Sequence, residues 1–369
     1  MASPSLQEHR FISATSADGN LRILIILLNS ALSAAIFSTI TIRFDEQLNR
    51  GTDLKGLSPF MNSMNFIVFD LEWNQPEGIP KEERVKLPFE IIEIGAVKLN
   101  AEGKLVSKFS RLIKPVVYDR INWRIKKMLQ LKPGELESGK GFKETAEEFL
   151  EWCGDDYIFC TWGGQDLTEL QRNMAYFDMP PLSERPIRYL DVQKIYARMN
   201  GVRNQISLET AVDALGIVKD VPFHRAFSDA YYTSKILALI PAQIINSVYA
   251  YDLYSLPVED KEELYIKDED SYTYYSRRYE AKEDILKRQK ILAVKCPVCG
   301  VTLKRKIKWF GHAGRALHSG AVCPEHGYVA GVLKVRQGET GGYFAEKTVK
   351  LVTEEGFNEL KERRDKNSK

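Results

Sequence analysis

The most regular hydrophobic pattern in the chain begins at residue 66, where four bulky apolar residues lead into the sequence Asp-Leu-Glu-Trp-Asn. Such a run predicts a buried strand. Because side chains two residues apart on a strand point to the same face, Asp70 and Glu72 should project together from its end. Two like charges that close repel each other unless a cation lies between them, and Mg²⁺ prefers carboxylate and phosphate oxygens. The pattern predicts either a metal-binding strand or a strand that simply ends in acidic residues at the surface.

Further apolar runs and amphipathic patterns predict an alternation of strands and helices. Strands are expected at 89–99, 105–113, 157–162 and 187–190, and helices near 123–131, 143–152, 166–177, 192–199, 207–215 and 227–240. A start rich in hairpins, followed by strands that alternate with helices, indicates an α/β fold with a sheet of mixed direction. Glu90 and Glu93 on the second strand could reach the site, but solvent-facing positions are favoured for them. Asp191 is expected to cap a helix rather than to act as a ligand.

Three more polar residues occur at the ends of these elements. Asp166 lies where a predicted strand meets a helix, which is the end of the sheet where α/β folds bind ligands, although a lone Asp there is also a common helix cap. His224 precedes the last helix and Asp229 lies in its first turns. Five positions along one helix do not share a face, but a histidine in the preceding loop can still converge with Asp229. Together with the first strand, these positions favour a metal-dependent site.

The three motifs resemble those of the DEDDh (DnaQ-like) 3′–5′ exonuclease family. They are the runs Ile67–Asn74, Cys160–Leu167 and His224–Asp229. Residues 89–97 and 208–216 resemble in particular the branch that contains KapD-type predicted sporulation inhibitors and eukaryotic RNA 3′-end trimming enzymes. The resemblance covers residues 65–245. It implies a ribonuclease-H-like fold with a mixed sheet of five strands flanked by helices.

The resemblance also implies a reaction. The enzyme would use two Mg²⁺ or Mn²⁺ ions to release nucleoside 5′-monophosphates from the 3′ end of single-stranded nucleic acid, with RNA favoured by the branch. Asp70, Glu72 and Asp229 would hold the ion that binds the attacking water. Asp70 would also bridge to the second ion, which Asp166 supports. His224 would be the general base, because imidazole is well matched to accept a proton near neutral pH.

Two similar turns near the C-terminus predict a metal site of another kind. The sequences Cys-Pro-Val-Cys-Gly and Cys-Pro-Glu-His-Gly place Cys296, Cys299, Cys323 and His326 at the spacing of a structural zinc site. This pattern predicts a small zinc-ribbon domain that holds one Zn²⁺, with hairpins from 301–310 and 328–335. Metal-binding cysteines favour a reducing compartment, so we expect a cytoplasmic protein.

Cations lie beside aromatic residues between these two turns, and no acid occurs there before Glu325. This arrangement suits the phosphates and bases of a nucleic acid, although a solvated strand face is the alternative. Two residues that follow the metal-binding strand could touch a terminal nucleotide or serve packing alone. The candidates for nucleic-acid binding are thus Trp73, Asn74, Lys304, Arg305, Lys306, Lys308 and Trp309.

Composition limits the remaining choices. A chain of 369 residues can form two domains, and a net charge of +2 means that any basic patch must be local. We expect an N-terminal extension at 1–64, an exonuclease domain at 65–245, an acidic, Tyr-rich linker at 246–290, a zinc ribbon at 291–350 and a charged tail at 351–369. A non-enzymatic nucleic-acid-binding or regulatory protein on a nuclease scaffold is the alternative function, but the intact carboxylate set argues against it.

The N-terminal extension contains an uncharged stretch at 23–42. Its length approaches the roughly 20 residues that cross a bilayer, so a membrane anchor is one interpretation. The other is that the extension is not part of the natural protein and that the domain begins near Met61 or Met64. A membrane is expected as a partner only if the extension is native.

Overall fold

A computed structural model describes residues 64–75, 87–118, 120–202, 205–311 and 316–367. The predicted membrane segment 23–42 lies outside these residues. Within the described ranges, no helix is long and apolar enough to cross a membrane.

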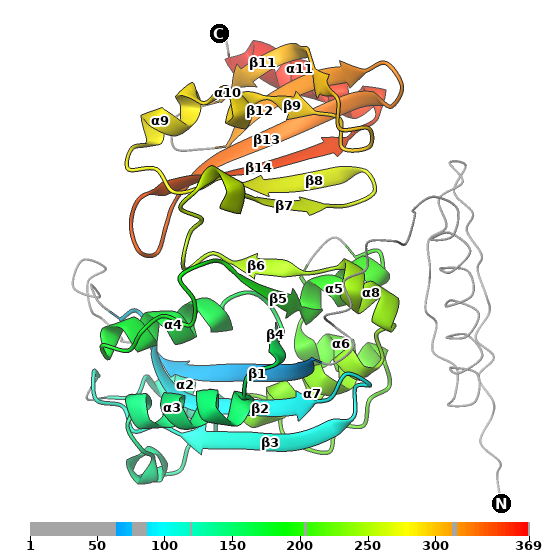
Figure 1. Cartoon of the computed structure of the whole chain (residues 1–369). Coiled ribbons are helices and arrows are strands. Elements are labelled where there is room, and N and C mark those ends of the chain that lie inside the picture. The colour runs from blue at the N-terminus through cyan, green and yellow to red at the C-terminus, as the bar shows by residue number, and fades with distance from the viewer. Residues whose placement is uncertain (1–63, 76–86, 119, 203–204, 312–315, 368–369) are drawn as a thin grey trace, which may run out of the picture.

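The first of two large sheets contains six strands in the order β3-β2-β1-β4-β5-β6 (Figure 1). β1, β4 and β5 pair in parallel, whereas β2, β3 and β6 join through antiparallel pairs. This arrangement confirms the predicted α/β fold with a mixed sheet. The strands are β1 (Asn65–Asn74), β2 (Glu90–Leu99), β3 (Leu105–Leu112), β4 (Tyr157–Thr161), β5 (Ile187–Asp191) and β6 (Ala250–Asp252).

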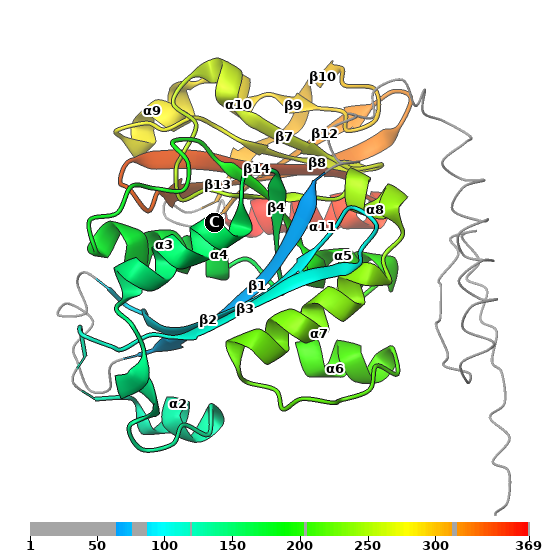
Figure 2. The same cartoon turned by 60° about the horizontal axis from the view of Figure 1, so that its bottom comes forward.

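Helices cover both faces of this sheet (Figure 2). Alternate residues of β1 enter two separate cores, since Ile67 and Phe69 pack towards α3 and α4, whereas Phe66 and Val68 pack towards α5, α6 and α7. A strand buried on both faces reads as a continuous apolar run, which explains its sequence. The helices are α2 (Trp123–Met128), α3 (Phe142–Cys153), α4 (Asp166–Tyr176), α5 (Val192–Met199), α6 (Leu208–Ala214), α7 (Ala226–Ala238) and α8 (Ala242–Ser247).

The expectation of five strands is wrong, because the segment predicted as a linker contributes β6 as a sixth. Asp252 at its end is buried and accepts hydrogen bonds from Thr168 Oγ1 (2.6 Å) and Gln171 Nε2 (2.7 Å) of α4. A run as short as Ala-Tyr-Asp carries no strand periodicity. Its pairing with β5 and its bonds to α4 decide its conformation instead.

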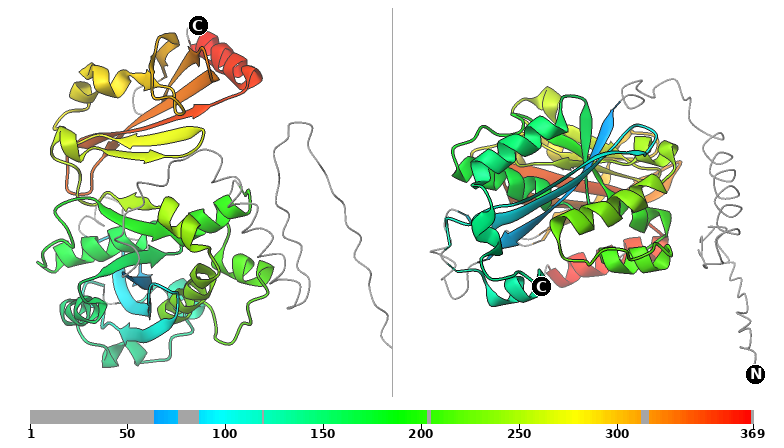
Figure 3. Two further views of the ribbon diagram at one scale, coloured as in Figure 1. Left: turned by 45° about the vertical axis from the view of Figure 1, so that its right-hand side comes forward. Right: turned by 90° about the horizontal axis from the view of Figure 1, so that it is seen from below.

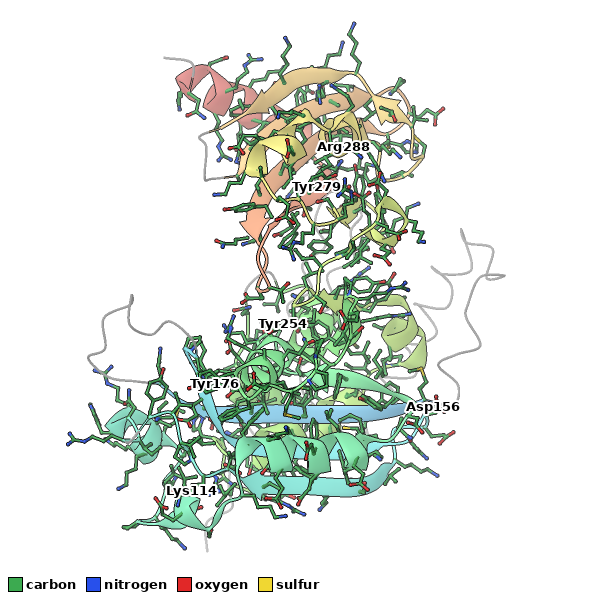
Figure 4. All side chains as sticks on the ribbon, turned by 60° about the vertical axis from the view of Figure 1, so that its left-hand side comes forward. Lys114, Asp156, Tyr176, Tyr254, Tyr279 and Arg288 are labelled. Atoms are coloured by element: carbon green, nitrogen blue, oxygen red, sulfur yellow. The ribbon has the colours of Figure 1, made fainter. Side chains whose placement is uncertain are left out.

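The second sheet has the order β11-β12-β13-β14-β8-β7 and is antiparallel throughout. Two of its strands also come from residues 246–290, so the prediction of a solvated linker there is wrong. Tyr272 and Tyr274 of β8 are buried, and so are Tyr254 and Tyr279. The last two, labelled in Figure 4, come from the same segment. The remaining elements are β7 (Leu264–Lys267), β8 (Ser271–Tyr275), α9 (Lys282–Lys287), α10 (Gln289–Leu292), β9 (Val294–Lys295), β10 (Thr302–Leu303), β11 (Arg305–Phe310), β12 (Leu317–Cys323), β13 (Gly327–Gln337), β14 (Tyr343–Leu351) and α11 (Glu354–Asn367).

The predicted ribbon at 291–350 is therefore part of a larger sheet. β10 pairs with β9 across the first cysteine turn, while β11 and β13 both pair with β12. The charged tail predicted at 351–369 contains the helix α11, which buries Phe357 and Leu360 against Ile307 of β11. The apolar side chains spaced three apart in this otherwise charged helix dock it on the sheet.

The two sheets lie next to each other along the molecule (Figure 3), and ion pairs between side chains join the two parts. The hairpin between β13 and β14 reaches α4, where Arg172 Nη2 lies 2.6 Å from Glu339 Oε2. A second ion pair joins Arg185 and Glu262 at 3.1 Å. The C-terminal sheet is thus attached to the helix that begins with Asp166.

Candidate active site and metal centres

Three carboxylates from two distant segments meet at the end of β1. Asp70 and Glu72 project from the same face of the strand, and Asp229 approaches from α7. One oxygen of each lies within 4.8 Å of the others. The structure therefore brings three of the four predicted acidic residues into reach of a single cation.

A glycine on β2 allows α7 to come this close. Gly95 pairs with Asp70 across the two strands. A Cβ atom at this position would lie 1.9 Å from the backbone nitrogen of Phe227, so a larger residue would push α7 away. Because Asp229 lies in the first turn of α7, this contact sets its distance from the strand.

Asp166, at the start of α4, also contacts β1. Its Oδ1 accepts a hydrogen bond from the Leu71 backbone N–H at 3.2 Å, and its side chain is buried at the start of α4. It is not in the group of three carboxylates. It is close enough, however, that its charge raises the pKa of Asp70.

Burial raises the pKa of all four acids, and the charges of neighbouring carboxylates raise it further. Burial raises the pKa of Glu72 to about 8, with a further contribution from the charge of Asp229. Burial likewise raises the pKa of Asp166 to about 7 and that of Asp229 to about 6, and it raises the pKa of Asp70 well above its usual range. Without a counter-ion, these carboxyl groups ionise only with difficulty. A hard divalent cation would stabilise their charged form, and carboxylate oxygens are the ligands that it prefers.

His224 precedes α7 in a left-handed backbone conformation, with φ of 63°. Such values are uncommon outside glycine and require support from the surroundings. The backbone N–H of His224 donates to Asp229 Oδ1 at 3.3 Å, which ties the loop to the carboxylate group. The side chain is exposed to solvent beside the site.

The prediction that Glu93 faces solvent is wrong. It is buried on β2 directly opposite Glu72, and Arg225 Nε lies 2.9 Å from its Oε2. Arg225 also contacts Glu135 Oε1 at 3.1 Å, so one guanidinium joins β2, the start of α7 and the segment after α2. The position of Glu93 within the apolar run 91–94 is a sign in the sequence that this acid is buried. The sequence does not show that Arg225 is its partner.

Glu90 and Asp191 also have partners within the fold. Glu90 is buried and accepts hydrogen bonds from three consecutive backbone N–H groups at 116–118, so it does not face solvent either. The Asp191 side chain accepts from Lys194 N at 3.0 Å and caps α5, as predicted.

The two residues after Glu72 have mainly structural contacts. Asn74 is fully buried, and its amide bonds the Arg120 carbonyl and the Asn122 backbone N–H, both at 3.0 Å. It is therefore unavailable to a nucleotide, and of the two expected roles the packing role remains. Trp73 is half-buried, with its ring centroid 5.4 Å from that of Phe89, which agrees with the packing interpretation.

The predicted zinc ligands form one compact cluster. Cys299 Sγ lies 3.8 Å from Cys323 Sγ, and His326 Nδ1 lies 3.6 and 3.5 Å from Cys296 Sγ and Cys323 Sγ. A tetrahedron of sulfur ligands about 2.3 Å from zinc has edges of about 3.8 Å, so these distances fit the ion. The pKa of Cys323 is lowered to about 6, because hydrogen bonds, chiefly to His326, outweigh the effect of burial.

Glycine completes both cysteine turns. Gly300 and Gly327 have φ of 74° and 81°, in the left-handed region that favours glycine. Each directly follows one of the predicted zinc ligands. The left-handed backbone conformation therefore explains why both sequence motifs end in glycine.

The basic stretch on β11 divides into two groups. Lys304, Lys306 and Lys308 are exposed to solvent. Arg305 and Trp309, in contrast, both donate hydrogen bonds to the Leu292 carbonyl, so these two residues mainly hold β11 to α10. Of the five residues proposed there, only the three lysines remain fully available to a nucleic acid.

Comparison with known proteins agrees with this geometry. A family model described as Exonuclease (RNase_T) matches residues 67–237. The "Probable 3′-5′ exonuclease KapD" of Bacillus subtilis (strain 168) is 24% identical over 181 residues, which are 49% of this chain and 86% of that protein. The "DNA polymerase III subunit epsilon" of Aquifex aeolicus (strain VF5) is 26% identical over 192 residues, 52% of this chain and 87% of that protein.

Among solved structures, the nuclease domain of 3′hExo, titled a DEDDh family member bound to rAMP, aligns with a TM-score of 0.42 and 19% identity over 48% of this chain and 90% of that one. The family match spans all five motif positions, from Asp70 to Asp229. Residues 67–237 of this chain therefore form an exonuclease domain, and these matches support a 3′–5′ exonuclease enzyme of the DEDDh type.

Proposed function

We propose that this exonuclease shortens single-stranded nucleic acid from its 3′ end with Mg²⁺ or Mn²⁺, and that RNA is its preferred substrate. The observation that carries the proposal is the group of three carboxylates whose oxygens lie within 4.8 Å of one another. Exonucleases of this family use divalent metal ions, and the donor set fits them. RNA is favoured by the resemblance to the KapD-type branch, although a relative named as a DNA polymerase subunit also matches.

Each residue of the site has a separate role in the proposed reaction. Asp70, Glu72 and Asp229 would hold one ion, and Asp70 together with Asp166 would support a second. Two divalent ions, when bound, offset the phosphate charge, activate a water molecule and stabilise the leaving oxygen. His224 accepts the proton of the attacking water, because its loop is tied to Asp229 and its ring is open to solvent.

We also propose that Cys296, Cys299, Cys323 and His326 hold one Zn²⁺ with a structural role. All four positions of a tetrahedron are filled by protein, which leaves none for a substrate. The surrounding sheet would present Lys304, Lys306 and Lys308 to nucleic-acid phosphates. Residues 291–369 contain 15 Lys and Arg against 8 Asp and Glu, so the charge that is nearly balanced over the whole chain is positive here.

One assay tests the proposed reaction. Single-stranded RNA and DNA of the same sequence, each labelled at the 5′ end, are incubated with Mg²⁺, Mn²⁺ or a chelator. We expect a ladder that shortens by one nucleotide at a time with either metal, faster on RNA, and no product with chelator. Asp229→Asn should abolish the ladder, and His224→Ala should slow it roughly 10²- to 10⁴-fold.

A 3′-phosphorylated substrate is the control for direction, since it removes the free 3′ end. Internal cleavage, shortening that continues in chelator, or an Asp229→Asn protein with the wild-type rate would each contradict the proposal.

A further inference from the structure

Helix α2 exposes an unusual amount of apolar surface for such a short element. Trp123 is 57% exposed and Met128 is 40% exposed, and Val116 in the preceding segment is 62% exposed. None of the described side chains of α2 is buried. An aromatic ring held this far out in solvent needs a reason beyond packing.

The same segment is strongly cationic. Six Lys and Arg lie between residues 114 and 132, against the single acid Asp119. Arg124, Lys126 and Lys127 are exposed, and the Arg124 guanidinium lies 5.4 Å from the centre of the Trp123 ring. Among the described residues, no ion pair is found for these three cations. The cluster thus offers a flat ring beside positive charges that form no ion pair with any carboxylate in the described part of the chain.

This cluster is fastened to the strand that carries the active-site carboxylates. Asn74, two residues beyond Glu72, bonds both the Arg120 carbonyl and the backbone N–H of Asn122, whose side chain caps α2. On its inner side, Ile125 packs on the small core that contains Ile92, the neighbour of Glu93. Figure 2 shows α2 near the end of β1.

We propose that α2 is a platform for the single strand just upstream of the 3′ end. A base stacks on Trp123 while Arg124, Lys126 and Lys127 contact the neighbouring phosphates. Any base can stack on an aromatic side chain, and the cations contact backbone phosphates, which every nucleotide carries. The platform therefore supplies affinity without sequence preference. The positive charge argues for a nucleic acid over a protein as the occupant. The inference rests on the proposed exonuclease function.

The experiment compares a 20-nucleotide single strand, which reaches the platform, with a dinucleotide, which occupies only the metal site. Trp123→Ala should raise the KM for the long substrate roughly 5- to 100-fold, since stacking contributes that much per base, while kcat and the rate on the dinucleotide stay unchanged. Trp123→Phe should retain most of the affinity, because it keeps an aromatic face. Each variant is first compared with wild type by thermal unfolding.

The cations are tested through salt dependence. Binding of the 20-nucleotide strand is measured in an Asp229→Asn background, where the substrate persists. Replacing both Lys126 and Lys127 with Ala should reduce the slope of log affinity against log salt by about 1.4, because each phosphate contact contributes about 0.7. Lys143→Ala is the matched control, since this lysine is exposed on α3, across the sheet, and should behave as wild type.

Wild-type KM and affinity in the Trp123→Ala protein would overturn the platform, as would equal losses on both substrates. Capture of a protein partner that depends on Trp123, without any effect on nucleic-acid binding, would assign α2 to protein recognition instead. If wild type binds through Trp123 but hydrolyses nothing, the platform stands and the proposed reaction falls.

Discussion

At the residue scale, the site is built from acids that the folded protein makes difficult to ionise. Burial raises the pKa of Glu72 from 4.5 to about 8 and that of Asp229 from 3.8 to about 6. Between the unfolded and folded pKa values, the folded state binds more protons than the unfolded state. The contribution of these groups to stability is therefore present at low pH and is lost as pH rises from about 4 to about 8.

We therefore predict that the metal-free protein loses stability as the pH rises. In chelator, the melting temperature should fall between pH 5 and pH 8, and Mg²⁺ or Mn²⁺ should restore it most strongly at pH 8, because the ions bind only the folded state. Glu72→Gln and Asp229→Asn should raise the metal-free melting temperature at pH 8, at roughly 2–4 °C per kcal/mol. Thermal unfolding across this pH range checks both effects.

Glu148→Gln is the matched control. This partly buried carboxylate contacts Lys140 and Arg111, which lower its pKa, so its removal should bring no gain at pH 8. A metal-free protein whose stability rises steadily from pH 5 to pH 8 would contradict the electrostatic description of the site.

At the element scale, the two cysteine turns act as one unit because they join different strands of the second sheet. The first turn lies between β9 and β10, and the second joins β12 to β13. An ion shared by both turns would fasten the short β9–β10 pair to the centre of the sheet. The free energy of metal binding would then contribute directly to folding of this sheet.

We predict one zinc per chain, measured by elemental analysis of the purified protein. Cys299→Ala should lose the metal and lower the melting temperature of the second sheet, while the rate on a dinucleotide changes little, because the ligands lie outside the exonuclease domain. Cys153→Ala removes a cysteine of the first sheet's core and should keep the zinc. Zinc retained at full stoichiometry in Cys299→Ala would exclude the proposed ligand set.

At the scale of the whole molecule, the boundary between the two sheets falls within the segment that looked like a linker. Asp252 completes the first sheet through its bonds to α4, whereas β7 and β8 belong to the second. A fragment that ends near residue 257 should therefore contain every strand of the first sheet. One that ends at 290 would carry β7 and β8 without the partner strand β14.

Three fragments test this boundary, all beginning at Met64. Residues 64–257 should be monodisperse and hydrolyse a dinucleotide. Residues 64–290 should aggregate, because Tyr272 and Tyr274 lose their cover and β8 becomes an open edge. Residues 64–249 should melt several degrees below 64–257, since α4 loses Asp252. Equal solubility and melting of all three, by size-exclusion chromatography and thermal unfolding, would place the boundary elsewhere.

The sequence by itself determined the features that depend on local pattern. The acids on β1, the acid at the start of α4 and the two cysteine turns lie on or directly beside elements with strong periodicity or special backbone requirements. Residue type and spacing predicted their chemistry, and the family comparison confirmed that the chain contains an exonuclease. The mixed sheet followed from the order of the same elements.

Only the tertiary structure decided the features that depend on partners far away in the chain. β6, β7 and β8 are short, and they are strands because β5 and β14 supply their hydrogen bonds. Glu93 is buried because Arg225, 132 positions later, neutralises it. A short strand needs its partner strand, and a buried charge needs its counter-ion, to be stable. Local periodicity does not reveal which distant segments pair, so these features could not be predicted from it.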